Sequence, residues 1–227
     1  MQKFLTFLTT VFTLGTVQAG NTIEGIQLSD SRIVFNQGVK SVNYGLTNEY
    51  EQPVLASAVV TDFNGKPSSD FAVSPSLYQV QPKTTFQGQI VQINPINSDK
   101  ENVYWLNIKT VLSDKDREDG ASGTLHFAIA QRIKLFYRPK SVTENCRYAA
   151  EHLKWLKTED GLKAINDSKV SVSIVNVEVG DKSQRISDTL LPKSEKTWKL
   201  DIDSGRNIKF KYVDEYGNIV ELPLLVK

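Results

Sequence analysis

The chain has 227 residues, a formal net charge of +1 and a single cysteine. A nearly neutral chain is not expected to have nucleic acid as its main partner, although a local basic patch is compatible with this charge. One cysteine excludes an internal disulfide, so stability must come from an apolar core, which this length allows. We expect Cys146 to be a buried thiol rather than a reactive one.

The N-terminus has the pattern of a secretory signal. Lys3 supplies the positive start, residues 4–17 are apolar with interspersed threonines, and Val17-Gln18-Ala19 is a small-residue cleavage site. This stretch is too short to span a membrane, and no other stretch reaches about eighteen apolar residues. We therefore expect export, cleavage after Ala19, and a mature chain that is not embedded in a membrane.

Short apolar runs separated by turn residues follow, and their period of two is typical of strands with one buried face. We expect strands within residues 25–35, 40–48, 54–63, 71–74, 76–80, 85–93 and 103–109. The first has a polar break at Ser29-Asp30-Ser31, where we expect a bend. The glycine-containing, charged stretch 113–122 predicts a loop. Many short strands with turns between them predict a β-sandwich, and no stretch before Pro139 has a helical period.

The longest predicted strand spans residues 125–139. Its apolar row is Leu125, Phe127, Ile129, Ile133, Leu135 and Tyr137, with Gln131 as the one polar member. The run covers about fifteen residues, against about five or six in a usual strand, and Pro139 ends it because proline lacks the N–H that a ladder needs. The pattern fits a long sandwich strand with an inward face. It also fits a strand that is partly an edge and keeps its apolar row for another chain.

Residues 140–143 have the character of a linker, and a second, smaller set of strands follows. Residues 151–157 fit either a short helix or a strand. Further alternation predicts strands within residues 161–166, 170–179, 190–202, 208–212 and 220–224. Gly180-Asp181 and residues 214–218 predict turns. This half of the chain therefore predicts a second β-sandwich.

Residues 130–139, from Ala130 to Pro139, resemble the signature strand of periplasmic pilus chaperones of the chaperone–usher pathway, the PapD-like family. Weaker similarity to the family occurs at residues 30–35, Pro75, Leu77, Pro82, and residues 101–107, 161–166 and 215–217. The resemblance implies an all-β fold of two immunoglobulin-like β-sandwich domains in an L-shaped arrangement. It favours a strand over a helix at residues 151–157. We expect a signal peptide at 1–19 and domains at 20–140 and 141–227.

The sequence departs from the family after the strand at 103–109. Val111-Leu112-Ser113 stands where the family usually has Ile-Pro-Pro. The loop at residues 111–124 therefore does not assign the chain to a chaperone subclass.

The resemblance implies a chaperone that holds pilus subunits whose immunoglobulin-like fold lacks its last strand. The chaperone would lend its own strand and deliver the subunit to an outer-membrane usher, and the free chaperone could associate with itself through that strand. Leu125, Phe127 and Ile129 would enter the subunit groove.

The resemblance also implies two charged sites. Arg32 and Lys134 would bind the C-terminal carboxylate of the subunit between the domains. Glu101, Arg138 and Glu215 would form an interdomain cluster, with Glu215 where we expect Asp in the family. Without the resemblance, all of these would be ordinary surface charges of little energetic value.

Catalysis is not expected, nor is a cofactor or a metal. The chain has 2 histidines, His126 and His152, and neither has a metal-ligand spacing. It has no Gly-x-Ser-x-Gly motif and no phosphate-binding glycine loop, and residues 114–120 lack the alternating ligands of a calcium loop. Two other functions fit the sequence less well. A pilus or adhesive subunit is disfavoured by the single cysteine and the two domains. A β-sandwich that binds a solute or acts as an enzyme would need a polar site, which the sequence does not offer.

Overall fold

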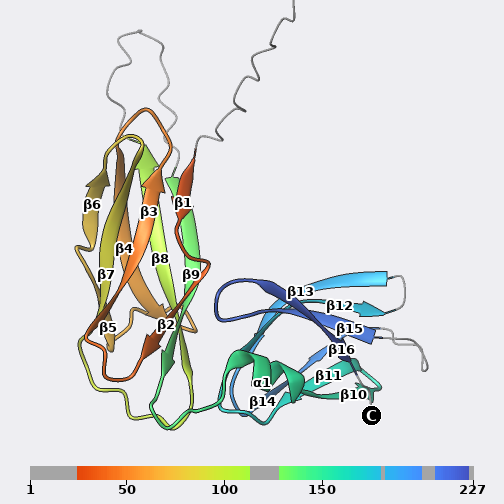
Figure 1. The fold of residues 1–227 in the computed structure, drawn as a ribbon. Helices are drawn as coiled ribbons and strands as arrows, with labels where there is room; N and C mark the ends of the chain where they lie inside the picture. Colours follow the sequence, from red (N-terminus) through yellow and green to blue (C-terminus); the bar gives the residue numbers. More distant parts are fainter. Residues whose placement is uncertain (1–24, 113–127, 180–181, 201–207, 225–227) are drawn as a thin grey trace, which may run out of the picture.

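The computed structural model of the chain describes residues 25–112, 128–179, 182–200 and 208–224. Two β-sandwich units, one upright and one lying across its base, give the molecule an L shape (Figure 1). The first unit contains β1 to β9 and the second contains α1 and β10 to β16. The predicted signal peptide, the loop at 114–120, Leu125, His126 and Phe127 lie outside the described residues.

Two sheets form the first unit. The four-stranded sheet has the order β1 (Ile26–Leu28), β3 (Ser41–Asn48), β7 (Thr84–Gln92) and β5 (Phe71–Ser74). The five-stranded sheet has the order β2 (Arg32–Asn36), β9 (Ala128–Arg138), β8 (Asn102–Leu112), β4 (Val54–Asp62) and β6 (Leu77–Val80). Leu46, Ile90 and Leu106 are fully buried between them, so the alternating apolar residues form the core as predicted.

The predicted strand at residues 25–35 is divided at its polar break. β1 pairs antiparallel with β3, whereas β2 pairs in parallel with β9, so the chain passes from one sheet to the other between them. β2 pairs only with residues 134–138 of β9. Residues 128–133 of β9 therefore have no strand on that edge within the described part of the chain.

β9 shows the predicted alternation, with one exception at its lower end. Leu135 and Tyr137 are buried in the core, whereas Ile129 and Ile133 are half-buried. Phe136 faces away from the core and is nevertheless buried, because Arg32 lies over its ring and contacts the second unit at Val213. The lower end of β9 is thus covered on both faces.

The second unit is smaller and has its own core. One sheet has the order β10 (Lys154–Thr158), β11 (Gly161–Asn166) and β14 (Ser194–Trp198). The other has the order β13 (Lys182–Leu190), β12 (Val172–Val179), β15 (Ile208–Val213) and β16 (Ile219–Leu224). Trp155 packs against Phe210 with ring centroids 5.1 Å apart, which joins the two sheets.

A short helix, α1 (Cys146–Glu151), precedes β10, so the strand expected at residues 151–157 is wrong in its first part. Asn145 caps the helix, because its side-chain oxygen accepts a hydrogen bond from the Tyr148 N–H at 2.8 Å. Ala149 and Ala150, both good helix formers, lie on its buried face. Cys146 is a free, buried thiol as predicted, and burial raises its pKa to about 11.

The described part of the chain contains no helix that is long and apolar enough to cross a membrane.

Replacing Leu135 by Ala should lower the free energy of unfolding by about 2–5 kcal/mol, because the side chain is fully buried and leaves a cavity. Ile129→Ala is the matched control on the same strand and face. Its side chain is half-buried, so the loss should stay below about 2 kcal/mol. Urea denaturation measures the free energy of unfolding of both variants. Equal losses would contradict the assignment of Leu135, but not of Ile129, to the core.

Candidate functional site

Two cations meet where the second unit adjoins the five-stranded sheet. Arg32 on β2 and Lys134 on β9 are register partners in the parallel ladder. Arg32 donates from Nη1 to the carbonyl oxygen of Val213 at 2.8 Å, and Lys134 donates from Nζ to Oγ of Ser173 at 3.1 Å. Both side chains therefore reach from the first unit across the cleft to the second.

Carboxylates act on this pair only from a distance: Asp214 raises the pKa of Arg32 and Asp188 raises that of Lys134, and both effects are smaller than that of burial. Among the described residues, neither Arg32 nor Lys134 forms an ion pair with a carboxylate, and Arg32 Nε is buried without a hydrogen-bond partner. Burial and the nearby Arg32 charge lower the pKa of Lys134 to about 8, and burial also lowers the pKa of Arg32. A carboxylate placed between them would raise the pKa of both cations.

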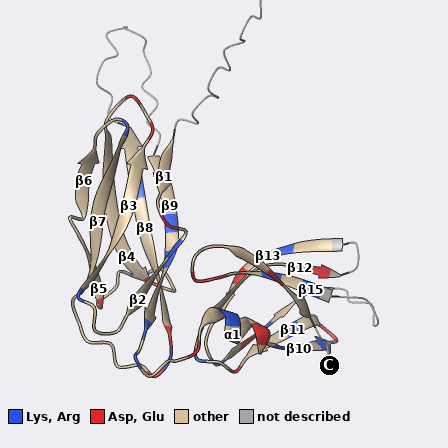
Figure 2. Ribbon diagram, in the orientation of Figure 1, with Lys and Arg blue, Asp and Glu red and all other residues tan. Residues whose placement is uncertain are grey.

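Aromatic side chains on the same face hold the cations in place. Arg32 lies over the Phe136 ring at 5.5 Å, and Lys134 lies over the Trp105 ring at 5.6 Å. Trp105 is the cross-strand partner of Lys134 on β8. Figure 2 shows the basic residues that β9 carries along its length.

The family resemblance predicts the two cations but not their neighbours. Trp105 and Phe136 could have been found, because the period of two places them on the same face of the sheet as Lys134. The Ser173 hydroxyl and the Val213 carbonyl had no sequence signal, because they come from the second unit.

A second charged group, made of Glu101, Arg138 and Glu215, joins the units beside the cation pair. Arg138 donates from Nη2 to Oε2 of Glu101 at 2.8 Å and also forms a close ion pair with Glu215. The Glu101 side chain is 1% exposed, and its other oxygen accepts the Ser171 N–H at 2.9 Å. Burial raises the pKa of Glu101, while Arg138 and Ser171 oppose that rise. All three predicted residues are therefore in direct contact.

Main-chain contacts also fix the position of the second unit. The Glu101 N–H donates to the carbonyl of Lys169 at 2.9 Å. Gly217, in the turn between β15 and β16, lies so close to the bend after β1 that an added Cβ would come within 2.3 Å of Ser31 Oγ. The charged cluster is therefore one of several contacts that hold the two units together.

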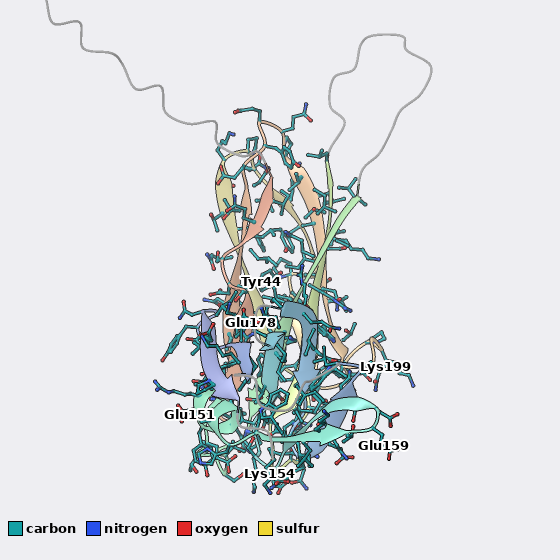
Figure 3. All side chains as sticks on the ribbon, turned by 90° about the vertical axis from the view of Figure 1, so that its right-hand side faces the viewer. Tyr44, Glu151, Lys154, Glu159, Glu178 and Lys199 are labelled. Carbon is teal, nitrogen blue, oxygen red and sulfur yellow. The ribbon has the colours of Figure 1, made fainter. Side chains whose placement is uncertain are left out.

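The second unit covers only the lower part of the first (Figures 1 and 3). Of the three residues predicted to enter a subunit groove, Ile129 lies on the upper part of β9 and is half-buried. Leu125 and Phe127 lie outside the described residues. No group of side chains in the described ranges has the composition of a metal site, and His152 is exposed and stacks on Tyr148.

Two family models match this chain. The model described as the PapD N-terminal domain of pili and flagellar-assembly chaperones matches residues 25–143. The PapD C-terminal domain of pili assembly chaperones matches residues 148–223. The chain belongs to the PapD family of pilus-assembly chaperones. It is a pilus subunit chaperone with two immunoglobulin-like domains, and fimbrial chaperones of this family are periplasmic.

Curated relatives agree with this membership, and solved structures share the fold. FimC of Escherichia coli strain K12 is 29% identical over 204 residues, covering 88% of this chaperone and 83% of FimC. FimB/FhaD of Bordetella pertussis is 28% identical over 209 residues, covering 85% and 84%. The E. coli chaperone DraB has the same fold, with a TM-score of 0.78 at 21% identity over 90% of this chain and 97% of DraB. A complex of the Salmonella enterica SafA pilin with the SafB chaperone matches with a TM-score of 0.77 at 23% identity, over 90% and 99%.

Arg138→Ala should destabilise the chaperone by about 3–5 kcal/mol, because it leaves the buried Glu101 without its charge partner. The loss should also widen the range of angles between the two domains, which small-angle X-ray scattering measures. Arg147→Ala removes an exposed ion pair with Glu151 and is the control, with little expected change in either measurement. A parental unfolding midpoint and scattering profile for Arg138→Ala would contradict a structural role of the cluster.

Proposed function

We propose that this chaperone captures an incomplete pilus subunit at the open edge of β9 and fixes the subunit's C-terminal carboxylate between Arg32 and Lys134. The observation that carries the proposal is the pair of half-buried cations without a carboxylate partner among the described residues. A planar guanidinium and a compact ammonium can together satisfy the oxygens of one carboxylate.

The position of the pair suits the end of an added strand. β2 pairs with β9 from Lys134 onward, and the edge before Lys134 is open among the described residues. A subunit strand on that open edge with its C-terminus at Lys134 would run parallel to β9 and end against the first residue of β2. The carboxylate would then set the register, because a slip by one residue turns every side chain to the other face.

The row that precedes the anchor would fill the subunit groove. In this proposal Leu125, Phe127 and Ile129 face the missing-strand groove, while the backbone of β9 completes the ladder of the subunit. Ile129 supports the proposal through its partial exposure. Unpaired strand edges associate readily, so the same edge can pair two free chaperones.

The remaining steps of the proposal concern delivery and export. The loaded chaperone would pass its subunit to an outer-membrane usher, and its role is binding rather than catalysis. The chain would be exported and cleaved after Ala19, and the mature domains would comprise residues 20–140 and 141–227. The basis for export is the signal pattern of Lys3, the apolar stretch and Ala19.

Arg32→Ala and Lys134→Ala should each weaken binding of a synthetic strand peptide of about ten residues with a free C-terminus. Removal of one partner of a buried charge interaction costs roughly 2–5 kcal/mol, or about 30-fold to several thousand-fold in affinity. Amidation of the peptide should produce a similar loss. Isothermal titration calorimetry measures the affinity of the two variants for the peptide and of the parent for the amidated peptide.

Lys109→Ala is the control, because Lys109 is an exposed cation on the same face of the same sheet. This variant should bind the peptide with the same affinity as the parent. Undiminished binding of the amidated peptide, or of both alanine variants at the anchor, would show that the carboxylate does not bind there.

Binding should also weaken as the pH rises through about 8, the pKa of Lys134 in the free chaperone. A bound carboxylate favours the ammonium form, so above this pH binding must take up a proton, and affinity should fall about tenfold per pH unit at most. The Lys134→Arg variant keeps its charge and should lose this pH dependence.

A loss of folding stability at high pH cannot account for this loss of affinity. The pKa of Lys134 is lowered from 10.5, so between about 8 and 10.5 the unfolded chain binds the extra proton. This group therefore makes the free chaperone more stable, not less, as the pH rises through that window. A flat affinity profile from pH 7 to pH 9 would mean that Lys134 does not contact the carboxylate.

A further inference from the structure

Gln131 interrupts the apolar row of β9, and the structure places its amide at the seam between the two sheets of the first domain. Its Nε2 donates to the carbonyl oxygen of Ile26 on β1 at 3.0 Å. Its Oε1 is buried and has no hydrogen-bond partner among the described residues. An unsatisfied buried acceptor is uncommon in native proteins and calls for an explanation.

The orientation of the amide follows from its partner. The Ile26 carbonyl can only accept a hydrogen bond, so the amide nitrogen of Gln131 must face it. Oε1 is therefore the atom left without a partner, and rotating the amide would place two acceptors against each other. Neither orientation satisfies this side chain with the partners that the described residues offer.

Gln131, with its buried and unpaired acceptor, lies beside the edge where a captured strand would be added. Gln131 belongs to the part of β9 that β2 does not cover, three residues before Lys134. A strand added to this edge would lie about 4.8 Å away. Side chains on its inward face would be neighbours of Gln131, while its backbone groups on the β9 side would be used in the ladder.

We infer that Gln131 determines subunit specificity by accepting, at Oε1, a hydrogen bond from a donor side chain on the inward face of the captured strand. The partner is a hydroxyl-bearing or amide-bearing residue of the captured strand, near its anchored C-terminus. A row of apolar residues alone would instead select an apolar side chain at this position. The inference rests on the proposed function, because it assumes a strand added to β9. It adds a polar requirement to a groove otherwise recognised by apolar contacts.

The test uses the full-length mature chaperone and a synthetic peptide of about ten residues with alternating Val and Ser and a free C-terminus. Each Val in turn is replaced by Thr, which has nearly the same shape and adds one donor. At one inward-facing position, Thr should bind the parent chaperone about three- to tenfold more tightly than Val. The Gln131→Met variant, similar in length but without an acceptor amide, should lose this preference.

Gln89→Met is the matched control, because it makes the same change at an exposed position of β7 in the other sheet. It should keep the parental preference for Thr. Equal binding of Val and Thr peptides at every position, or a preference that survives in Gln131→Met, would overturn the inference. The loss of affinity on amidation of the peptide tests the carboxylate anchor separately. If amidation weakens binding but no Thr preference exists, the inference about Gln131 fails while the proposed function stands.

Discussion

The short parallel ladder between β2 and β9 determines how the rest of the molecule can work. It ends at the pair formed by Arg32 and Lys134. Below this point both faces of β9 are covered, and above it the described residues place no strand on that edge of β9. A strand with unpaired backbone groups is a template for another chain. A single ladder therefore creates the open edge, limits its length and places two cations at its end.

The cleft contains cations in two different electrostatic states. Arg138 is matched by two carboxylates, Glu101 and Glu215, which come from the two domains, so its charge joins them. Among the described residues, the side chains of Arg32 and Lys134 donate only to a carbonyl and a hydroxyl of the second domain. Burial lowers the pKa of both, and the more distant carboxylates only partly oppose this effect. The first group is suited to holding the domains together, and the second to receiving an anion from outside.

Gln131 extends this contrast from charge to hydrogen bonding. Its amide nitrogen donates to the Ile26 carbonyl, whereas its acceptor oxygen has no partner among the described residues. Functional sites are where natural proteins tolerate such local inconsistencies. A bare apolar row selects partners mainly by shape and size. One buried acceptor within the row would penalise a partner that cannot donate to it, which is a sharper form of discrimination.

The sequence by itself determined the all-β class and the alternation of β9, and its family resemblance indicated the residues of both charged groups. A period of two reports which side chains share a face, and the strand from Ala130 to Pro139 is distinctive enough to carry a family resemblance. Helix α1 was missed because a single turn with a local cap leaves no sustained period. Only the tertiary structure decided that Phe136 is buried on the outer face and that Ser173 and Val213 meet the cations. It also decided that the acceptor of Gln131 has no partner among the described residues. Each of these depends on contacts between distant segments, and no local pattern records such contacts.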